Sequence, residues 1–533
     1  MWKPFSLTSV LLELPAELID RILCNLDLRS LLTCKQVCKN LKQRIENGKG
    51  IQYIMELEIN GLEMNPNNKW SATDCFDCLQ KYRSAWQDLE GLGEKPMVVP
   101  MRNGGLWELY GGVLAQKDRE GIFHFSRLPS GIRHIEEETW QVKPDIQGIR
   151  DFGMDPSQDL LVWITAPSNS APLSLHLRTL KKAEQHPRAR HDVIRHDRCT
   201  AAGRWHFSIK IMQDYIGLWA YMRTQGDSDA THDITEFYVW NWKEDKLELD
   251  ITTKSTQSFA FISDRHVVLA DRYVSEDLET TDGYLTLIDF KAEDSTKKSL
   301  GEVSNSMKLC YPTIKDEIVY QSFNIASEPN PGWTPGQDDR APFFVAKENR
   351  IFTVSMTLSH LEGRDKAFDH FIPLAAFKKC LTRLNTSKAR SLPWSEWAPK
   401  ETRMIRALPA SEVWVCFVQG SRSIAASYRR IREEGGGQSQ KFFANVYDFN
   451  QLALRREKAV GSVLPKHCER VDDTREALDI NGIWTENVET SLPYRLYSRN
   501  ISGTPLGFYY LMCTADHLVL VDSEKKEYQV FSV

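Results

Sequence analysis

The sequence predicts a mainly β protein with a small all-α module at its N-terminus. Over residues 10–48, apolar side chains recur three or four positions apart, which is the spacing of a helix face. After Gly104 the pattern changes to short runs rich in Val, Ile, Phe, Tyr and Trp, bounded by charged or Gly-containing turns, as is typical of strands. We therefore expect a helical module at 10–48, a helical linker at 49–103 and a β domain at 104–533.

The first predicted helix begins at Pro15. Proline suits the first turn of a helix because its missing N–H is no loss there, and Glu17 places negative charge near the positive end of the helix dipole. The apolar positions form two adjoining faces, one with Leu14, Leu18 and Ile22 and the other with Ile19, Leu23 and Leu26. This helix is therefore apolar over a wide arc.

Two further short helices are predicted in the same module. Asp27 can cap a helix that carries Leu28, Leu31 and Leu32. A third helix would carry the stripe Val37, Leu41 and Ile45 and end at a left-handed Gly48. So small a unit has too much surface to bury all these side chains within itself, so some apolar surface should go to a partner.

These residues resemble the consensus of the F-box family over roughly residues 10–48. The shared features are the Leu14-Pro15 start, Glu17 two positions later, and the pairs Ile22-Leu23, Leu31-Leu32 and Val37-Cys38. The resemblance implies a three-helix module that docks on the Skp-type adaptor of a cullin-RING (SCF-type) ubiquitin ligase, while the rest of the chain presents a target. Carried over position by position, the adaptor contacts would be Leu14, Pro15, Leu18, Ile22, Leu23, Leu26, Leu31, Leu32 and Val37. The alternative is a small helical cap folded onto the main body.

The linker should contain one longer helix. Ser71 or Thr73 can cap it, and its apolar positions follow helical spacing. These positions are Cys75, Leu79, Tyr82, Trp86 and Leu89. Cys75 and Cys78 form a lone CxxC without a second pair at zinc-ligand spacing, so we expect a buried helical cysteine and no metal. A rigid helix here would fix the angle between the module and the β domain.

The β domain shows a repeating unit. Apolar runs that follow an acidic residue begin at Asp159, Asp214, Asp264 and Asp316, and a similar run spans 411–416. The first four lie about fifty residues apart, the scale of one propeller blade, so we expect a β-propeller of roughly six to eight degenerate blades. A pair of β-sandwiches or an irregular all-β body is the competing fold.

A second recurring unit runs an apolar strand into Asn or Asp and a polar turn. It occurs at 238–243, 285–290, 445–450 and 518–522, and predicts the hairpin between the third and fourth strands of a blade. It resembles a degenerate WD repeat without the Gly-His and Trp-Asp signatures. The alternation at 528–533 indicates a last strand that completes a blade, so truncating it should be harmful.

Two segments at 327–336 and 429–437 lack periodicity and are predicted to be loops. The arginines of 188–204 and 422–432 could read an acidic or phosphorylated target segment by bidentate contacts, or could simply be solvated. His186, His191 and His196 fall in the first of these stretches and are expected in a solvated loop.

Composition narrows the class of partner. The 533 residues carry 67 Lys and Arg against 72 Asp and Glu, a net charge of −5, which favours neither nucleic acid nor an anionic membrane as a partner. No stretch reaches the roughly 20 apolar residues of a membrane span. Eleven irregularly spaced cysteines suit reduced thiols and hence a cytoplasmic or nuclear location.

No catalytic motif is present, and no cofactor is expected. The sequence therefore predicts a non-catalytic substrate-recognition subunit of an SCF-type E3 ubiquitin ligase, with the adaptor on the N-terminal helices and an unknown target protein on the β domain. An F-box interaction scaffold that acts without ubiquitination is the alternative, and a propeller enzyme acting on carbohydrate is a more distant one.

Overall fold

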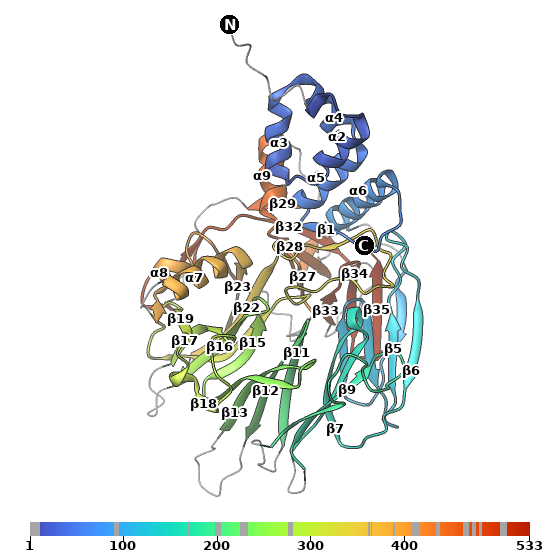
Figure 1. The fold of residues 1–533 in the computed structure, drawn as a ribbon. Coiled ribbons are helices and arrows are strands. Elements are labelled where there is room, and N and C mark those ends of the chain that lie inside the picture. The colour runs from blue at the N-terminus through green and yellow to red at the C-terminus, as the bar shows by residue number, and fades with distance from the viewer. Residues whose placement is uncertain are drawn as a thin grey trace, which may run out of the picture.

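The fold is a cluster of helices standing on a large propeller (Figure 1). It is seen in a computed structural model that describes residues 11–532 apart from 90–94, 168–170, 198–203, 224–232, 275–280, 361–362, 364, 387–389, 408–415, 433–437, 462–467, 472–475, 479–481 and 502–508. The helices precede the propeller in sequence, and the described chain ends within the propeller close to the helices (Figure 1).

Helices α2 to α5 form the N-terminal cluster in the described part of the chain. They are α2 (Ala16–Leu23), α3 (Leu28–Val37), α4 (Lys39–Asn47) and α5 (Lys49–Ile59). Asp27 caps α3 as predicted, because its carboxylate accepts a hydrogen bond of 2.7 Å from the Ser30 N–H. Two details of the predicted third helix are wrong. Val37 ends α3 and does not begin α4, and Gly48 is extended, with φ −74°, because α5 follows directly.

The connector contains β1 (Leu62–Met64) and α6 (Ala72–Asp88). Ser71 caps α6 by accepting from the Asp74 N–H at 3.2 Å, so of the two predicted caps Ser71 is the one used. The predicted stripe is confirmed, since Cys75, Leu79, Tyr82, Trp86 and Leu89 are all buried. The helix ends at Leu89, which adopts the left-handed conformation with φ 50°.

Seven sheets radiate as propeller blades, which confirms the predicted fold and blade number. Blades 1 and 2 each have four antiparallel strands in chain order. Blade 1 contains β3 (Trp107–Tyr110), β4 (Val113–Lys117), β5 (Phe123–Arg127) and β6 (Glu138–Val142). Blade 2 contains β7 (Ile149–Asp155), β8 (Leu160–Thr165), β9 (Leu173–Thr179) and β10 (Val193–His196).

Blades 3 and 4 each gain a short fifth strand that a later segment donates in parallel. Blade 3 contains β11 (Trp205–Met212), β12 (Tyr215–Arg223), β13 (Asp233–Asn241) and β14 (Lys246–Thr253), with β18 (Lys298–Ser299) at its edge. Blade 4 contains β15 (Thr256–Phe261), β16 (His266–Val274), β17 (Thr281–Asp289) and β19 (Ser306–Cys310), with β24 (Ser391–Leu392) at its edge.

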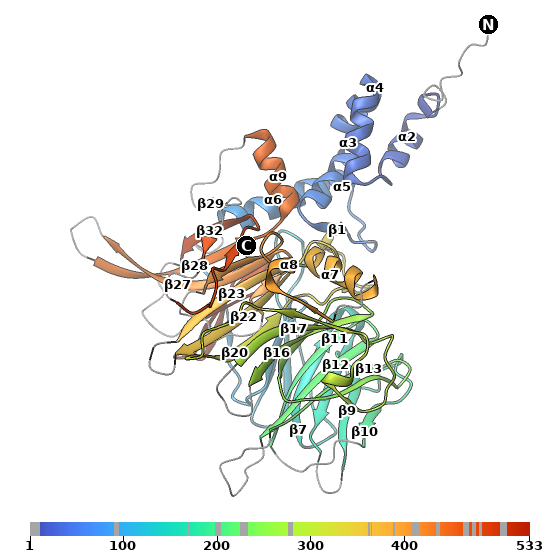
Figure 2. The same ribbon diagram turned by 90° about the vertical axis from the view of Figure 1, so that its left-hand side faces the viewer.

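Blade 6 carries the longest hairpin of the described strands, formed by β27 and β28. Blade 5 contains β20 (Ile318–Ala326), β22 (Ile351–His360), β23 (Lys366–Pro373) and β25 (Arg403–Arg406). Blade 6 contains β26 (Val418–Gln419), β27 (Arg422–Arg432), β28 (Gln438–Asp448), β32 (Tyr494–Asn500) and β29 (Cys468–Val471). The hairpin of β27 and β28 projects from the propeller (Figure 2).

Blade 7 closes the ring with a strand from before the propeller. Its order is β33 (Tyr509–Cys513), β34 (His517–Asp522), β35 (Glu527–Ser532) and then β2 (Met97–Pro100). β2 pairs antiparallel with β35, from Met97 opposite Val530 to Pro100 opposite Glu527. Pro100 is tolerated because this is an edge strand. The closing strand thus lies within the residues assigned to the linker, and the predicted final strand is confirmed as part of a blade.

The repeated sequence units fall on different strands. The runs after Asp159, Asp214 and Asp264 are second strands, whereas the run after Asp316 is the first strand of blade 5. The unit at 518–522 leads from the second strand of blade 7 to the third, so its assignment to a third strand was wrong. The predicted strand at 411–416 lies outside the described residues apart from Cys416.

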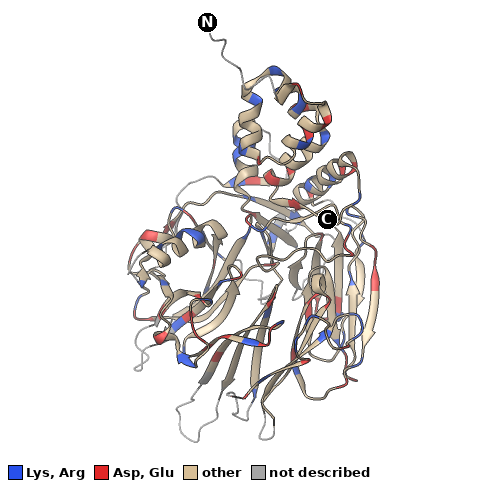
Figure 3. Ribbon diagram, viewed as in Figure 1, with Lys and Arg blue, Asp and Glu red and all other residues tan. Residues whose placement is uncertain are grey.

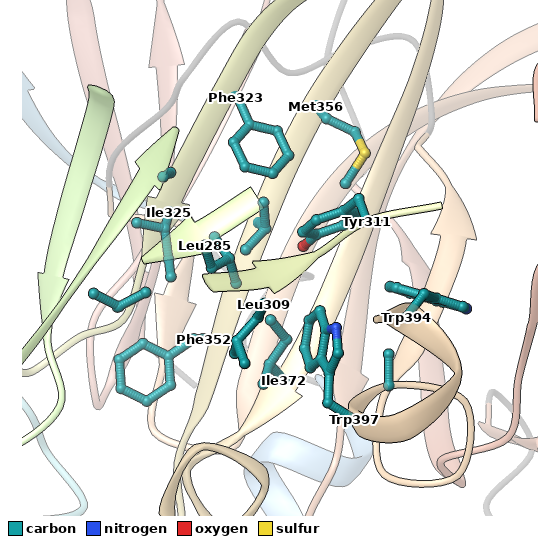
Figure 4. Packing of buried hydrophobic residues seen from close by; sticks show 14 of the residues in the cluster. Leu285, Leu309, Tyr311, Phe323, Ile325, Phe352, Met356, Ile372, Trp394 and Trp397 are labelled. Carbon is teal, nitrogen blue, oxygen red and sulfur yellow. The ribbon is translucent and has the colours of Figure 1, made fainter. Parts of the chain in front are cut away.

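The remaining elements are insertions. They are η2 (Pro156–Gln158), η3 (Leu300–Glu302), β21 (Phe343–Val345), α7 (Leu374–Thr386), α8 (Trp394–Trp397), α9 (Gln451–Val460), β30 (Glu476–Ala477) and β31 (Glu489–Thr490). α7 and α8 seal the outer side of blades 4 and 5. There Trp394 and Trp397 pack with Tyr311, Leu309 and Ile372 (Figure 4).

Candidate functional site

The two faces of α2 have opposite surroundings. Leu14, Leu18 and Ile22 are 36, 46 and 41% exposed. On the adjoining face Ile19 and Leu23 are each 1% exposed and join the core of the helical cluster. The predicted split of the apolar arc into two faces is therefore observed, and one of the faces is left open.

Helix α3 also carries exposed apolar side chains. Leu31 is fully buried in the core of the cluster, whereas its neighbour Leu32 is 44% exposed and Val37 is 54% exposed. We name Leu14, Leu18, Ile22, Leu32 and Val37 the exposed row. An exposed group of large apolar side chains on a small module is a feature of interaction surfaces.

The other predicted contact residues have different positions. Pro15 is exposed at the start of α2, and Leu26 is half-buried. Leu23 and Leu31 face inward and support the surface from beneath. Sequence reasoning missed Leu12, which is 36% exposed and lies two residues before Leu14, the start of the predicted motif. Both signs of charge are interspersed over these helices and over the propeller (Figure 3).

Helix α5 belongs to two cores at once. Ile51, Met55 and Ile59 face the core of the helical cluster, while Tyr53 and Leu57 face a large core shared with the connector and the propeller. The spacing of four residues within each set places them on two sides of one helix. The Tyr53 hydroxyl also donates to the Pro342 carbonyl at 2.9 Å. Helix α5 thus joins the module to the body.

Helix α9, inserted between strands of blade 6, braces α5 from the side. Glu56 of α5 accepts from Arg456 of α9 at 2.5 Å and from Arg83 of α6 at 3.3 Å. Asn450 at the start of α9 donates to the Ile59 carbonyl at 2.8 Å, and Ala453 is part of the core of the helical cluster. Helices α5 and α6 of the N-terminal part and α9 of blade 6 therefore meet at one carboxylate. Figure 2 shows the ribbons of these three helices close together.

The connector is fixed to the propeller where the ring closes. Tyr82 and Trp86 of α6 both donate to the Ala515 carbonyl, at 2.7 and 3.1 Å. Beside them, buried Arg133 pairs with buried Asp516, joining blades 1 and 7. The Arg133 guanidinium holds the pKa of the Asp516 carboxyl below its usual range despite burial. The body beneath the helices is thus tied at the closure.

The propeller face next to the helices is covered by the protein's own chain. Residues 327–350, which link β20 to β22, run over the turns between the first and second strands of blades 1 and 3. Asn330 N–H donates to the Tyr110 hydroxyl at 3.1 Å, and the Gln213 amide donates to the Gly332 carbonyl at 2.8 Å. Further along, β21 pairs with β1. The predicted loop at 327–336 is confirmed and occupies this face.

Ionisable side chains line the inner strands of the propeller. Glu108 is on β3, Asp151 on β7 and Lys210 on β11, with Glu328 directly after β20. Desolvation raises the pKa of Asp151 and of Glu328 to about 7 and lowers that of Lys210 to about 8. Desolvation and the neighbouring Asp151 raise the pKa of Glu108 well above its usual value. Among the described residues, no group of three His, Cys, Asp or Glu side chains is placed to hold a metal ion.

The predicted Arg and His segments are not free loops. Arg429 and Arg430 lie on β27, and 433–437 lie outside the described residues. His186 and His196 are buried at 2 and 4% exposure, so a solvated loop is wrong for them. His186 packs edge-on against Trp242, and β10 carries His196. His191 is exposed and pairs with Asp245 at 2.5 Å.

Comparison with known proteins bears on the helical cluster. A family model described as the F-box domain matches residues 11–49. Residues 11–49 are an F-box domain. The chain therefore carries an F-box domain followed by a seven-blade propeller. No curated protein matches the chain.

Among solved structures, the WD40 domain of SCAP from fission yeast is similar over 82% of this chain and 94% of its own, at 10% identity and a TM-score of 0.31. The propeller assignment rests on the seven sheets themselves. No helix in the described part of the chain is long and apolar enough to cross a membrane.

Proposed function

We propose that this protein is the non-catalytic substrate-recognition subunit of an SCF-type E3 ubiquitin ligase. The observation that supports this most is the exposed row on the F-box domain, since F-box domains bind Skp-type adaptors and this row is apolar surface that the chain leaves uncovered. The adaptor in turn links to the cullin-RING core. We place this activity in the cytoplasm or nucleus, where free thiols such as the ten described cysteines stay reduced.

The brace around Glu56 supports a receptor role. Ligase catalysis by proximity depends on holding a target lysine near the charged conjugating enzyme, which raises its effective concentration. A flexible linker would let the bound target occupy many positions relative to the conjugating enzyme. Here α5 lies in two cores and its Glu56 is bound by both α6 and α9, which supports a fixed placement of the propeller relative to the F-box domain.

The covered face limits where a target can bind. Residues 327–350 and β1 occupy the propeller face beneath the helices. The target would therefore contact the outer walls or the opposite face, which are also the surfaces directed away from the F-box domain (Figure 1).

Adaptor capture tests the first half of the proposal. Replacing Leu14 and Pro15 with Ala, or Leu18 and Ile22 with Asp, should abolish capture of a purified Skp-type adaptor while the thermal unfolding of the propeller stays unchanged. A control variant with Leu452→Asp and Val460→Asp on α9 introduces the same two negative charges at other exposed apolar side chains and should capture normally. Unchanged capture by the Leu18 and Ile22 variant would refute the contact assignment.

Reconstitution tests the second half and separates it from the scaffold alternative. The complete ligase should ubiquitinate the protein itself or a bound target, and this should require the exposed row. Adaptor binding without any ubiquitination would favour an F-box scaffold. Proteins that co-purify only when the proteasome is inhibited would be candidate targets.

A further inference from the structure

A large groove opens in the outer wall of the propeller where blades 3 and 4 meet. It encloses about 1000 Å³. One wall is the end of β14 with the turn that follows it, and the other is formed by β19 and the residues beside β24. Residues 299–306, which lead from the donated strand β18 into β19, close one end (Figure 1, near β18). The strand exchange between neighbouring blades therefore creates the groove.

The charges that line this groove are mostly positive. Lys254, Lys308 and Arg390 are exposed, and no ion pair joins them to any residue that the structure describes. The ammonium of Lys308 lies 4.4 Å from the centre of the Tyr284 ring, which holds it at the groove. Glu302 is the single carboxylate in the described lining, and it is already engaged, accepting from the Ser299 N–H at 2.7 Å and hydroxyl at 2.8 Å.

The groove also contains many hydroxyl groups, but most of their protons point inward. Thr286 donates to Asp271, which is fully buried beneath the floor. Thr252 donates to the Lys298 carbonyl at 3.3 Å, and Ser306 donates to the Val303 carbonyl at 2.9 Å. Because these donors are satisfied within the protein, the three cations are the main groups left to bind a ligand.

We propose that this groove binds an acidic segment of extended polypeptide, whose carboxylate or phosphate oxygens pair with Lys254, Lys308 and Arg390. Arg390 can contact two such oxygens with its planar fork, while the lysines act as point charges. The volume of about 1000 Å³ leaves room for neighbouring residues, so side chains on either side of the anion also meet the walls of the groove. The inference rests on the proposed function only in taking this segment to belong to the target protein.

Peptide binding can be measured on the full chain alone, without any adaptor or other ligase subunit. The probes are three pools of short fluorescent peptides, identical except for a central phosphoserine, aspartate or serine, read by fluorescence polarisation. The phosphoserine and aspartate pools should bind, the serine pool should not, and added salt should weaken binding because exposed charges are screened. The stronger of the two acidic pools identifies the source of the anion.

Two variants of equal charge change locate the site. Lys308→Gln with Arg390→Gln should weaken binding roughly tenfold, since each exposed pair contributes up to about 1 kcal/mol. Arg455→Gln with Lys458→Gln removes the same charge from α9 and should leave binding unchanged. Equal loss in both variants would attribute binding to net charge, and failure of both acidic pools would overturn the proposal.

Competition settles whether a peptide is needed. Inorganic phosphate and free phosphoserine should compete far less well than the peptides. If they compete equally, the groove binds small anions and the peptide part of the proposal is wrong. Since no ligase is used, these results are independent of the ubiquitination test. Absence of ubiquitination together with intact peptide binding would refute the ligase role but not the proposal that the groove binds peptides.

Discussion

The F-box domain and the propeller use neighbouring apolar residues in opposite ways. On β8 the successive residues Val162 and Trp163 point to opposite faces of the sheet, yet both are fully buried because another blade lies on each side. On α3 the successive residues Leu31 and Leu32 differ completely, since only one side of the helix has a core. A propeller blade completes its burial within the chain, whereas the F-box domain leaves one apolar side exposed.

Removing the last strand should prevent the propeller from burying its blades and should have the largest effect on stability. A chain that ends at Lys526 lacks β35, which pairs with β34 on one side and with the closing strand β2 on the other. Both neighbours would lose their hydrogen-bond ladders, and the ring would open. We expect loss of the cooperative thermal transition and rapid proteolysis. Glu524→Ala, in the exposed turn before β35, is the control and should unfold normally.

The adjacent residues Leu31 and Leu32 on α3 allow stability and adaptor binding of the F-box domain to be tested separately. Leu31→Ala should destabilise the domain by about 2–5 kcal/mol because it leaves a cavity in a packed core. Leu32→Ala should change the unfolding free energy by less than about 0.5 kcal/mol, since the residue is at the surface. Adaptor affinity should show a direct loss for Leu32→Ala. Denaturant unfolding and adaptor titration measure the two effects, and equal unfolding losses would show that both side chains are structural.

The difference between the buried blades and the partly exposed F-box helices could be predicted from the sequence only in part. Spacing divided α2 into two apolar faces, but Leu18 and Ile19 are equally hydrophobic, so the exposed face came from the F-box resemblance and not from periodicity. The closing strand Met97–Pro100 was missed because four residues that include a proline give almost no alternating pattern. The ion pair between Glu56 and Arg456 could not be predicted either, because the two residues are 400 positions apart and no local sequence pattern indicates their contact.

The same reasoning explains why the blade period failed after Asp316. The fourth unit begins a first strand because residues 290–305, which include the donated strand β18, are inserted between β17 and β19 of blade 4. The insertion of residues 327–350 between β20 and β22 of blade 5 then shifts every later strand further along the sequence. An insertion that covers a face has no strand periodicity of its own. The fold class was therefore predictable from composition and spacing, whereas the covered face depended on three-dimensional contacts.

The interior of the propeller gives the smallest and most specific prediction, because it keeps ionisable groups where the F-box domain keeps only apolar ones. Desolvation raises the pKa of Asp151 to about 7 in the folded protein, above the usual value near 3.8. The folded state therefore binds more protons than the unfolded state between about pH 4 and 7, and stability falls as pH rises through this range. Above about pH 7 the Asp151 carboxyl is ionised in the folded protein as well, and the cost of burying this charge then lowers the free energy of unfolding.

Asp151→Asn should remove this pH dependence. The asparagine carbonyl can still accept from the Phe152 N–H, which reaches the native carboxylate at 2.8 Å, so the local geometry is kept. We expect the variant to have a higher unfolding temperature than the native protein at pH 8 and a smaller advantage, or none, at pH 5. Thermal unfolding at the two pH values measures this difference. An equal change in unfolding temperature at pH 5 and pH 8 would contradict this prediction. It would show that the Asp151 carboxylate is fully solvated inside the propeller, as it would be on the surface of the F-box domain.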